Sequence, residues 1–261
     1  MAKIADIISI IESFAPVQLQ EPYDNAGLQV GDPQASVTAV LLCLDVTTDI
    51  VAEAIERGCN LIISHHPLLF GGIKSVTTST ECGRIVIDAV RHNIAIYSAH
   101  TNLDRAREGV SWEIARMLGL RDIEVLQKDH ADPGVGLGIV GQIEQVPTLE
   151  FLRKVKDIFH VKCLRYSDNF PSLTVKRVAV CGGAGASLIR EAVRAGADVM
   201  VTGDVKYHDF TTYSPMILIA DIGHFESELC TRQIFMRLLS DRFSDLQLYV
   251  SEVEGNPVNC L

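Results

Sequence analysis

The sequence predicts an α/β fold built from two similar domains with mixed, largely parallel sheets and a metal site in the cleft between them. Short apolar runs alternate with amphipathic segments of helical length, the pattern of strands joined by crossover helices. Part of this pattern occurs twice, and polar groups follow several of the apolar runs. A chain of 261 residues is long enough for two small domains. We expect the first to span residues 1–125 and the second 126–261, with a C-terminal helix from about residue 224 packing back on the first.

Hydrophobic periodicity indicates the elements of the first half. Ile4, Ile7, Ile8 and Ile11 recur at helical spacing before Pro16, which predicts an amphipathic N-terminal helix. After it, apolar runs of strand length alternate with helical segments. We expect strands at residues 37–44, 61–64 and 94–99, and helices at 48–57, 83–92 and 109–118.

The second half repeats part of the first. A looser stretch at residues 130–136 separates the halves, and we expect a strand at 137–143 and a helix at 148–159 after it. Placing residues 39–66 over 177–204 without a gap aligns the apolar positions of a strand, a helix and a second strand. Five positions are identical in this alignment: Val40/Val178, Cys43/Cys181, Glu53/Glu191, Ala54/Ala192 and Gly58/Gly196. We therefore expect the two domains to be structurally equivalent.

Composition favours a soluble cytoplasmic protein. The formal net charge is −10, with 23 basic and 33 acidic residues, which disfavours non-specific binding to nucleic acid. No apolar run approaches the roughly 20 residues that span a bilayer, so no membrane association is expected. Asp6 and Glu12 interrupt any signal-peptide core. The seven scattered cysteines contain no C-x-x-C pair, as expected of reduced thiols.

His65 and His66 are the most informative residues. They close the apolar run at residues 61–64 and are followed by Pro67, which ends the strand. Adjacent strand residues point to opposite faces, so both imidazoles can serve one site only where the strand ends. We therefore expect them to bind a metal.

Other strand ends carry the same residue types. His100 and Asp104 follow the strand at 94–99, in a helix or a turn, and His224 and Glu228 follow a strand at 216–220. Spacing of four on a helix places His224 and Glu228 on one face, whereas Glu226 points away and is expected to be solvated. Ligands gather at the carboxyl ends of strands in open α/β sheets, so these groups are expected to converge on the cleft between the halves.

The number of donors favours two ions. His65, His66, Asp104, His224 and Glu228 make five nitrogen and oxygen ligands without thiolate, a set that suits zinc, iron, manganese or nickel. A catalytic zinc usually takes three protein ligands, so five fit two divalent ions better. His100 and His208 are candidates to move protons or to orient a ligand. His92, His130 and His160 are interpreted as structural.

Two further stretches carry polar or glycine-rich patterns. Residues 202–208 (TGDVKYH) offer an acid, an amine and an imidazole that orient a substrate or move protons, or else form an ordinary polar turn. Residues 182–187 (GGAGAS) join a strand to a helix and could cradle an anion on backbone N–H groups, or simply make a tight turn. They lack the lysine of a P-loop.

At these residues the sequence resembles the family of GTP cyclohydrolase 1 type 2 homologs, also called Nif-three-like proteins. The motifs that carry the resemblance are YDNAGLQVG at 23–31, ISHHPLLF at 63–70, SAHTNLD at 98–104, TGD at 202–204 and GHFESE at 223–228. Tyr23 stands where the family commonly has Trp, and the chain is too short for the large central insertion of many members. It therefore resembles the compact bacterial form.

The resemblance implies a di-metal centre with its ligands at His65, His66, Asp104, His224 and Glu228. It also implies two similar α/β domains and a toroidal homohexamer whose metal sites face an internal cavity. The leading hypothesis is a metal-dependent hydrolase that acts on a small nucleotide-like or phosphorylated substrate. The alternative is a non-catalytic metal-binding adaptor or metal-trafficking protein.

Overall fold

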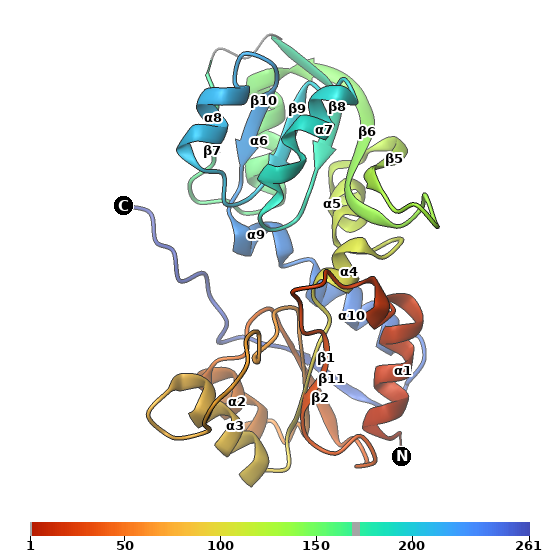
Figure 1. The fold of residues 1–261 in the computed structure, drawn as a ribbon, viewed down its shortest axis with the longest axis vertical. Coiled ribbons are helices and arrows are strands. Elements are labelled where there is room, and N and C mark those ends of the chain that lie inside the picture. Colours follow the sequence, from red (N-terminus) through yellow and green to blue (C-terminus); the bar gives the residue numbers. More distant parts are fainter. Residues whose placement is uncertain (1, 169–172) are drawn as a thin grey trace. The chain divides into compact units, whose positions relative to one another are not determined.

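The chain forms two compact units that do not follow the predicted boundary at residue 125. A computed structural model describes residues 2–168 and 173–261 (Figure 1). The first unit runs from the N-terminus to Leu103 and includes Thr231–Gly255, and the second comprises Asp104–Cys230 and Asn256–Leu261. The segment around residue 125 belongs wholly to the second unit, because its strand pairs there with the next strand along the chain.

The first unit contains a five-stranded sheet in the order β1-β4-β3-β2-β11. Its strands are β1 (Gly27–Val30), β2 (Ala39–Cys43), β3 (Leu61–Ser64), β4 (Ala95–Ser98) and β11 (Gln247–Val250). The pairs β4–β3, β3–β2 and β2–β11 are parallel, and only the edge strand β1 is antiparallel. The sheet is therefore largely parallel, as predicted.

Helices cover both faces of this first sheet (Figure 1). They are α1 (Ile4–Phe14), α2 (Thr48–Glu56), α3 (Glu81–Arg91) and α10 (Thr231–Ser240), with a 3₁₀ turn at Val17–Leu19. Helices α2 and α3 pack against each other, and their buried Ile50 and Ile85 cluster with Leu41 and Ile62 of the sheet. Helices α1 and α10 also contact each other. The successive strand residues of β2 and β3 are all buried, because both faces are covered.

The second unit contains a six-stranded sheet in the order β5-β6-β8-β9-β10-β7. Its strands are β5 (Arg121–Lys128), β6 (Gly136–Pro147), β7 (Arg165–Tyr166), β8 (Thr174–Val180), β9 (Val199–Thr202) and β10 (Leu218–Asp221). Strands β8, β9 and β10 are parallel, whereas β5, β6 and β7 pair in antiparallel fashion. This sheet is mixed, with more antiparallel pairs than the first. The loose stretch at 130–136 is the turn of the β5–β6 hairpin and not a linker between the halves.

Among the described residues, six helices are assigned to the second unit or begin just before it. They are α4 (Thr101–Arg105), α5 (Val110–Leu118), α6 (Thr148–Ile158), α7 (Ile189–Arg194), α8 (Tyr207–Tyr213) and α9 (His224–Glu228), with a 3₁₀ turn at Gly185–Leu188. Helices α5 and α6 contact β6 and β8, whereas α7 contacts β9 and α8 contacts β10. The single helix predicted from residue 224 is two helices, α9 and α10, because the chain passes from the second unit to the first after Cys230.

The predicted structural equivalence of the two halves is visible in strand register. In β2 and β3, Val40 lies opposite Leu61, and in β8 and β9, Val178 lies opposite Val199. These are the positions that the ungapped alignment superimposes. The similarity continues toward one edge of each sheet. Strand β4 pairs in parallel with β3, as β10 does with β9, and the edge strands β1 and β7 then pair in antiparallel fashion with β4 and β10. The two sheets share four strands with the same order and directions.

Two leucines of α6 give a test of this packing. Leu152 is 5% exposed and Leu149 is 53% exposed. Leu152→Ala should lower the free energy of unfolding of the second unit by about 2–5 kcal/mol, because it leaves a cavity. Leu149→Ala should change it by about 0.5 kcal/mol. Chemical denaturation followed by circular dichroism measures both, and equal effects would show that α6 is not packed as described.

Candidate functional site

Three histidines gather at the carboxyl end of the first sheet. His65 and His66 directly follow β3, and His100 follows β4. The ring centroids are 5.1 Å apart for His65 and His66, 5.3 Å for His65 and His100, and 5.5 Å for His66 and His100. One ligand atom from each residue lies within 4.8 Å of the others, so the three side chains could hold a metal ion. The strand-end position predicted for His65 and His66 is confirmed.

Each of these three rings is oriented by an oxygen at its Nδ1 atom. The acceptors are the Ala99 carbonyl for His65 at 2.8 Å, the Asp45 carboxylate for His66 at 2.8 Å and the Asp24 carboxylate for His100 at 2.7 Å. Carbonyl and ionised carboxylate oxygens only accept hydrogen bonds, so Nδ1 carries a proton. In the neutral ring the lone pair is then on Nε2, which is the arrangement that metal-binding histidines usually have.

Asp24 is anchored independently of His100. The backbone N–H of Thr101 donates to it at 3.0 Å, its own loop contributes the Asn25 N–H at 2.7 Å, and the Thr101 hydroxyl also donates. Burial raises the pKa of Asp24, but the hydrogen bonds from His100 and Thr101 outweigh it and hold that pKa well below its usual range. The carboxylate therefore stays ionised and fixes the His100 ring.

The second unit carries a matching cluster of histidine and carboxylates. His224 begins α9 and Glu228 ends it, and His224 Nε2 lies 3.0 Å from a Glu228 carboxylate oxygen, so the predicted spacing of four does bring them together. A carboxylate oxygen of Asp104 lies within 4.8 Å of one of Glu228. Glu228 is buried, whereas His224 is partly exposed. Two carboxylates this close without a cation repel each other, so the donor set suits a metal ion.

His224 is oriented in the same way as His66. Its Nδ1 donates to Asp204, which follows β9, at 2.8 Å. Asp204 has a φ of 54°, in the left-handed region that Asp adopts more readily than most residues other than glycine.

The glycine-rich turn after β8 approaches this second cluster. The Gly183 N–H donates to the Ser227 hydroxyl on α9 at 2.8 Å. A Cβ atom at Gly183 would overlap a carboxylate oxygen of Glu228. The turn is therefore more than a strand-to-helix connection, because it packs directly against a proposed ligand.

Other predicted residues lie outside these clusters. His208 is exposed on α8 beside Tyr207, with ring centroids 5.5 Å apart, and it joins no group of potential metal ligands within the described part of the chain. Glu226 is half-buried and accepts a hydrogen bond from Asn256 at 2.9 Å, so it is not simply solvated as expected. His92 is exposed, and its Nδ1 lies 2.8 Å from the Asp88 carbonyl of its own helix, as befits a structural residue.

Asp24 and Asp45 orient histidines but are not among the residues that the sequence pattern predicts. Asp24 lies within the motif at 23–31, and Asp45 follows the end of β2. Polar residues that directly follow a buried strand predicted the site histidines, and Asp45 has the same position after β2, so the same criterion identifies it.

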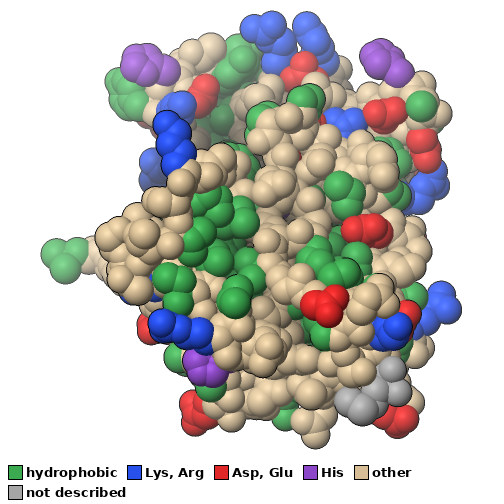
Figure 2. Space-filling model, turned by 60° about the horizontal axis from the view of Figure 1, so that its bottom comes forward, with side chains coloured by type: hydrophobic (Ala, Val, Ile, Leu, Met, Phe, Trp, Pro, Cys, Tyr) green, Lys and Arg blue, Asp and Glu red, His purple; other side chains and the backbone are tan. Residues whose placement is uncertain are grey.

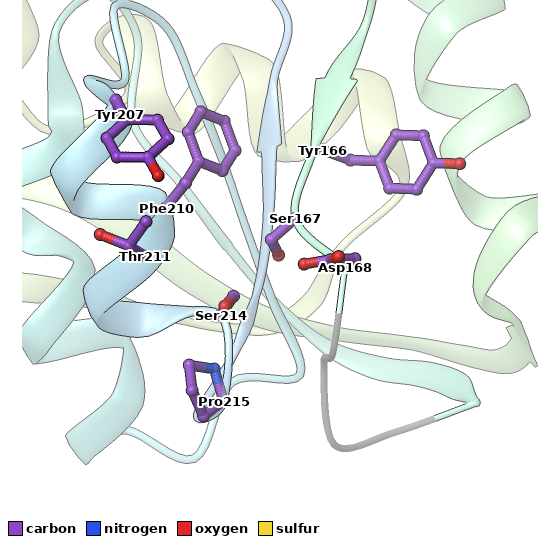
Figure 3. Close-up of a pocket in the computed structure, with 8 residues that line it drawn as sticks. All are labelled: Tyr166, Ser167, Asp168, Tyr207, Phe210, Thr211, Ser214 and Pro215. Atoms are coloured by element: carbon purple, nitrogen blue, oxygen red, sulfur yellow. The ribbon is translucent and has the colours of Figure 1, made fainter.

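A hollow of about 720 Å³ lies elsewhere in the second unit (Figure 3). Tyr207, Phe210 and Thr211 of α8 line one side, and Tyr166 to Asp168 line the other.

On the face shown in Figure 2, Lys and Arg side chains are scattered and interspersed with acidic ones. No helix in the described residues is long and apolar enough to cross a membrane.

These features define a class of protein: a two-sheet α/β protein with histidine and carboxylate clusters at the strand ends of both units. The chain belongs to the family Duf34/NIF3 (NGG1p interacting factor 3), whose model matches residues 2–257. This confirms the resemblance seen in the sequence.

The relatives match over nearly their whole length. A Clostridium acetobutylicum protein named GTP cyclohydrolase 1 type 2 homolog is 41% identical over 229 residues, which cover 87% of this chain and 85% of that protein. A protein of the same name from Clostridium perfringens is 38% identical over 258 residues, 98% of each chain. The crystal structure of a Staphylococcus aureus protein matches with a TM-score of 0.90 at 28% identity, covering 100% of this chain and 99% of that one.

Proposed function

We propose that the protein binds divalent metal ions through His65, His66, Asp104, His224 and Glu228. The observation that carries this proposal is the orientation of the rings. His65 and His66 present Nε2 because an oxygen acceptor holds Nδ1. His224 is held at Nδ1 by Asp204 and has Nε2 3.0 Å from a Glu228 oxygen, where a metal ion could take the place of the shared proton. His100 is oriented in the same way beside His65 and His66, and we keep it as the group that moves protons and not as a metal ligand. That two ions are shared by the ligands of both units stays a prediction.

We propose hydrolysis of a small nucleotide-like or phosphorylated substrate as the activity. Bound metal ions would lower the pKa of water to near neutrality and polarise the bond under attack. Among the protein's own groups, the Asp24 carboxylate holds Nδ1–H of His100, which leaves Nε2 of His100 available to accept a proton. The name of the relatives, GTP cyclohydrolase 1 type 2 homolog, supports a nucleotide as the first substrate to try.

The test is turnover by the purified full chain on GTP and a panel of phosphoesters. We expect His65→Ala to lose at least about 100-fold in rate, since removal of a ligand should cost more than the roughly 10–100-fold loss typical of residues that only orient ligands. His92→Ala is the matched control, because His92 is exposed on α3 and bonds only within its own helix.

Two outcomes would contradict this proposal. Equal turnover by wild-type and His65→Ala protein would remove the metal from the mechanism. Stoichiometric metal without product from any substrate would favour the metal-binding adaptor or metal-trafficking protein. The toroidal homohexamer stays a prediction, which light scattering can test against six times the chain mass of 28.6 kDa.

A further inference from the structure

All seven cysteines lie in the part of the chain that the structure describes, and two of them, Cys163 and Cys260, are exposed. The other five are buried or half-buried: Cys43, Cys59, Cys82, Cys181 and Cys230. Burial raises the pKa of Cys59 to about 11 and also raises that of Cys82, so these thiols keep their protons at neutral pH. Because a thiol must be ionised and accessible to react, Cys163 and Cys260 are the cysteines most open to modification.

The two exposed thiols contact each other, although they are about one hundred residues apart in sequence. Cys163 lies between α6 and β7, and Cys260 lies in the C-terminal segment Asn256–Leu261. Both belong to the second unit, and a hydrogen bond joins their side chains. A disulfide forms only between cysteines that the backbone already brings together, and this pair meets that requirement.

The C-terminal segment is held to the second unit by side chains. After β11 the described chain forms no further helix or strand, so no backbone ladder fixes the segment (Figure 1). Asn256 at its start donates to the Glu226 carboxylate of α9 at 2.9 Å, and Cys260 near its end contacts Cys163. A covalent bond at Cys260 would therefore fix the free end of a segment whose beginning is already anchored.

The Cys260 thiol is the donor in this contact. Partial desolvation, the hydrogen bond to Cys163 and the negative charge of a Cys163 thiolate raise the pKa of Cys260. The Glu226 carboxylate adds to this effect, whereas Lys162 opposes it. Cys260 therefore keeps its proton and donates it toward Cys163. Thiol–disulfide exchange begins with a thiolate, so Cys163 is the sulfur that attacks first.

We propose that Cys163 and Cys260 are a redox modification site, at which a disulfide forms and ties the C-terminal segment to the second unit. The oxidant is a low-molecular-weight disulfide such as glutathione disulfide. Cys163 loses its proton, its sulfur attacks one sulfur of the oxidant, and the first glutathione leaves as a thiolate. Cys260 then loses its proton and attacks Sγ of Cys163, which releases the second glutathione. The two cysteines lose two electrons and two protons, and the oxidant is reduced to two thiols. Excess reduced thiol reverses the exchange, so the tie is conditional.

The experiment equilibrates the full chain with mixtures of reduced and oxidised glutathione. Acid quenching, alkylation of the remaining thiols and non-reducing peptide mapping by mass spectrometry then identify each cross-link. We expect a single pair of linked peptides, which contain Cys163 and Cys260, in a chain that still migrates at 28.6 kDa. The ratio of disulfide to dithiol should be at least about 10-fold higher in folded protein than in guanidinium chloride, because the fold has already closed the long loop between the two residues.

Single variants test the pairing. Cys163→Ser and Cys260→Ser should each keep one glutathione on the remaining exposed cysteine, because the second step has no partner. Cys82→Ser is the matched control and should form the disulfide as the wild-type protein does, since Cys82 is half-buried and its thiol donates to the Leu68 carbonyl. Amide hydrogen exchange at residues 256–261 should slow on oxidation of wild-type protein and not on oxidation of Cys260→Ser protein.

Three results would overturn this inference. They are glutathione on both cysteines of folded wild-type protein without a cross-link, a disulfide that joins two chains, and equal disulfide ratios in folded and denatured protein. None of them bears on the proposed function, because neither cysteine is among the proposed metal ligands. Elemental analysis should accordingly find the same metal content in reduced and oxidised protein.

Discussion

Glu228→Gln protein should lose bound metal as completely as His66→Ala protein does. Glu228 is 3% exposed, and one carboxylate oxygen is 3.0 Å from His224 Nε2. The substitution keeps the shape of the side chain and removes its charge, so it deletes an anionic donor without opening a cavity. We expect metal affinity to fall by more than the roughly 10–100-fold seen when an orienting residue is changed.

The measurement is elemental analysis of protein purified without chelator, followed by competition with a chromogenic chelator. The double variant His66→Ala/Glu228→Gln tests whether the two clusters serve the same ions. If they do, the double variant loses little beyond either single variant, because effects within one site are not additive. If each cluster binds its own ion, each single variant keeps one ion and only the double variant loses both.

Glu226→Gln is the matched control for this series. Glu226 is on the same short helix, and its bond to Asn256 survives the exchange because the amide oxygen still accepts. Metal content should stay at the wild-type level. A loss equal to that of Glu228→Gln would mean that helix α9, and not the Glu228 carboxylate, is what the substitutions disturb.

The ends of the strands could be predicted because the pattern of apolar residues indicates which strands are buried and how they pair. The apolar run at 61–64 is continuous and buried on both faces, so the end of this strand is clear from the sequence. The ungapped alignment of this run with 199–202 also predicts that β8 and β9 pair in the same register as β2 and β3. Spacing of four placed His224 and Glu228 together because both fall on one short helix. Local patterns of this kind need no knowledge of the rest of the chain.

The boundary between the two units and the contact of Asp24 with His100 depend on pairings between segments that are distant in sequence. Strand β11 joins the first sheet beside β2, about two hundred residues earlier in the chain, and no local pattern indicates that partner. Asp24 meets His100 only because β1 returns along β4 as an antiparallel edge. The loose stretch at 130–136 reads equally well as a linker or a hairpin turn, and only the pairing of β5 with β6 decides between them.

Gly183→Ala should weaken metal binding by about 10–100-fold, the range typical of residues that position a ligand. It should lower the stability of the protein little more than the same substitution does at a control glycine, Gly196. Gly183 has a φ of 58° and Gly196 a φ of 69°, so alanine meets the same left-handed backbone at both positions. That shared strain is about 1–2 kcal/mol. At Gly196 no atom lies within 4 Å of an added Cβ, whereas at Gly183 the Cβ overlaps a Glu228 carboxylate oxygen and comes within 3.3 Å of His224 Cε1.

The carboxylate can relieve this overlap only by moving. Because Glu228 is buried and bound to His224, the movement breaks the donor arrangement at a proposed metal ligand, and the rest of the fold is spared. Thermal unfolding of the two metal-free variants should therefore be similar, whereas their metal affinities, measured by chelator competition, should differ. Equal affinities in Gly183→Ala and Gly196→Ala would show that Glu228 is not held against the glycine-rich turn when metal binds.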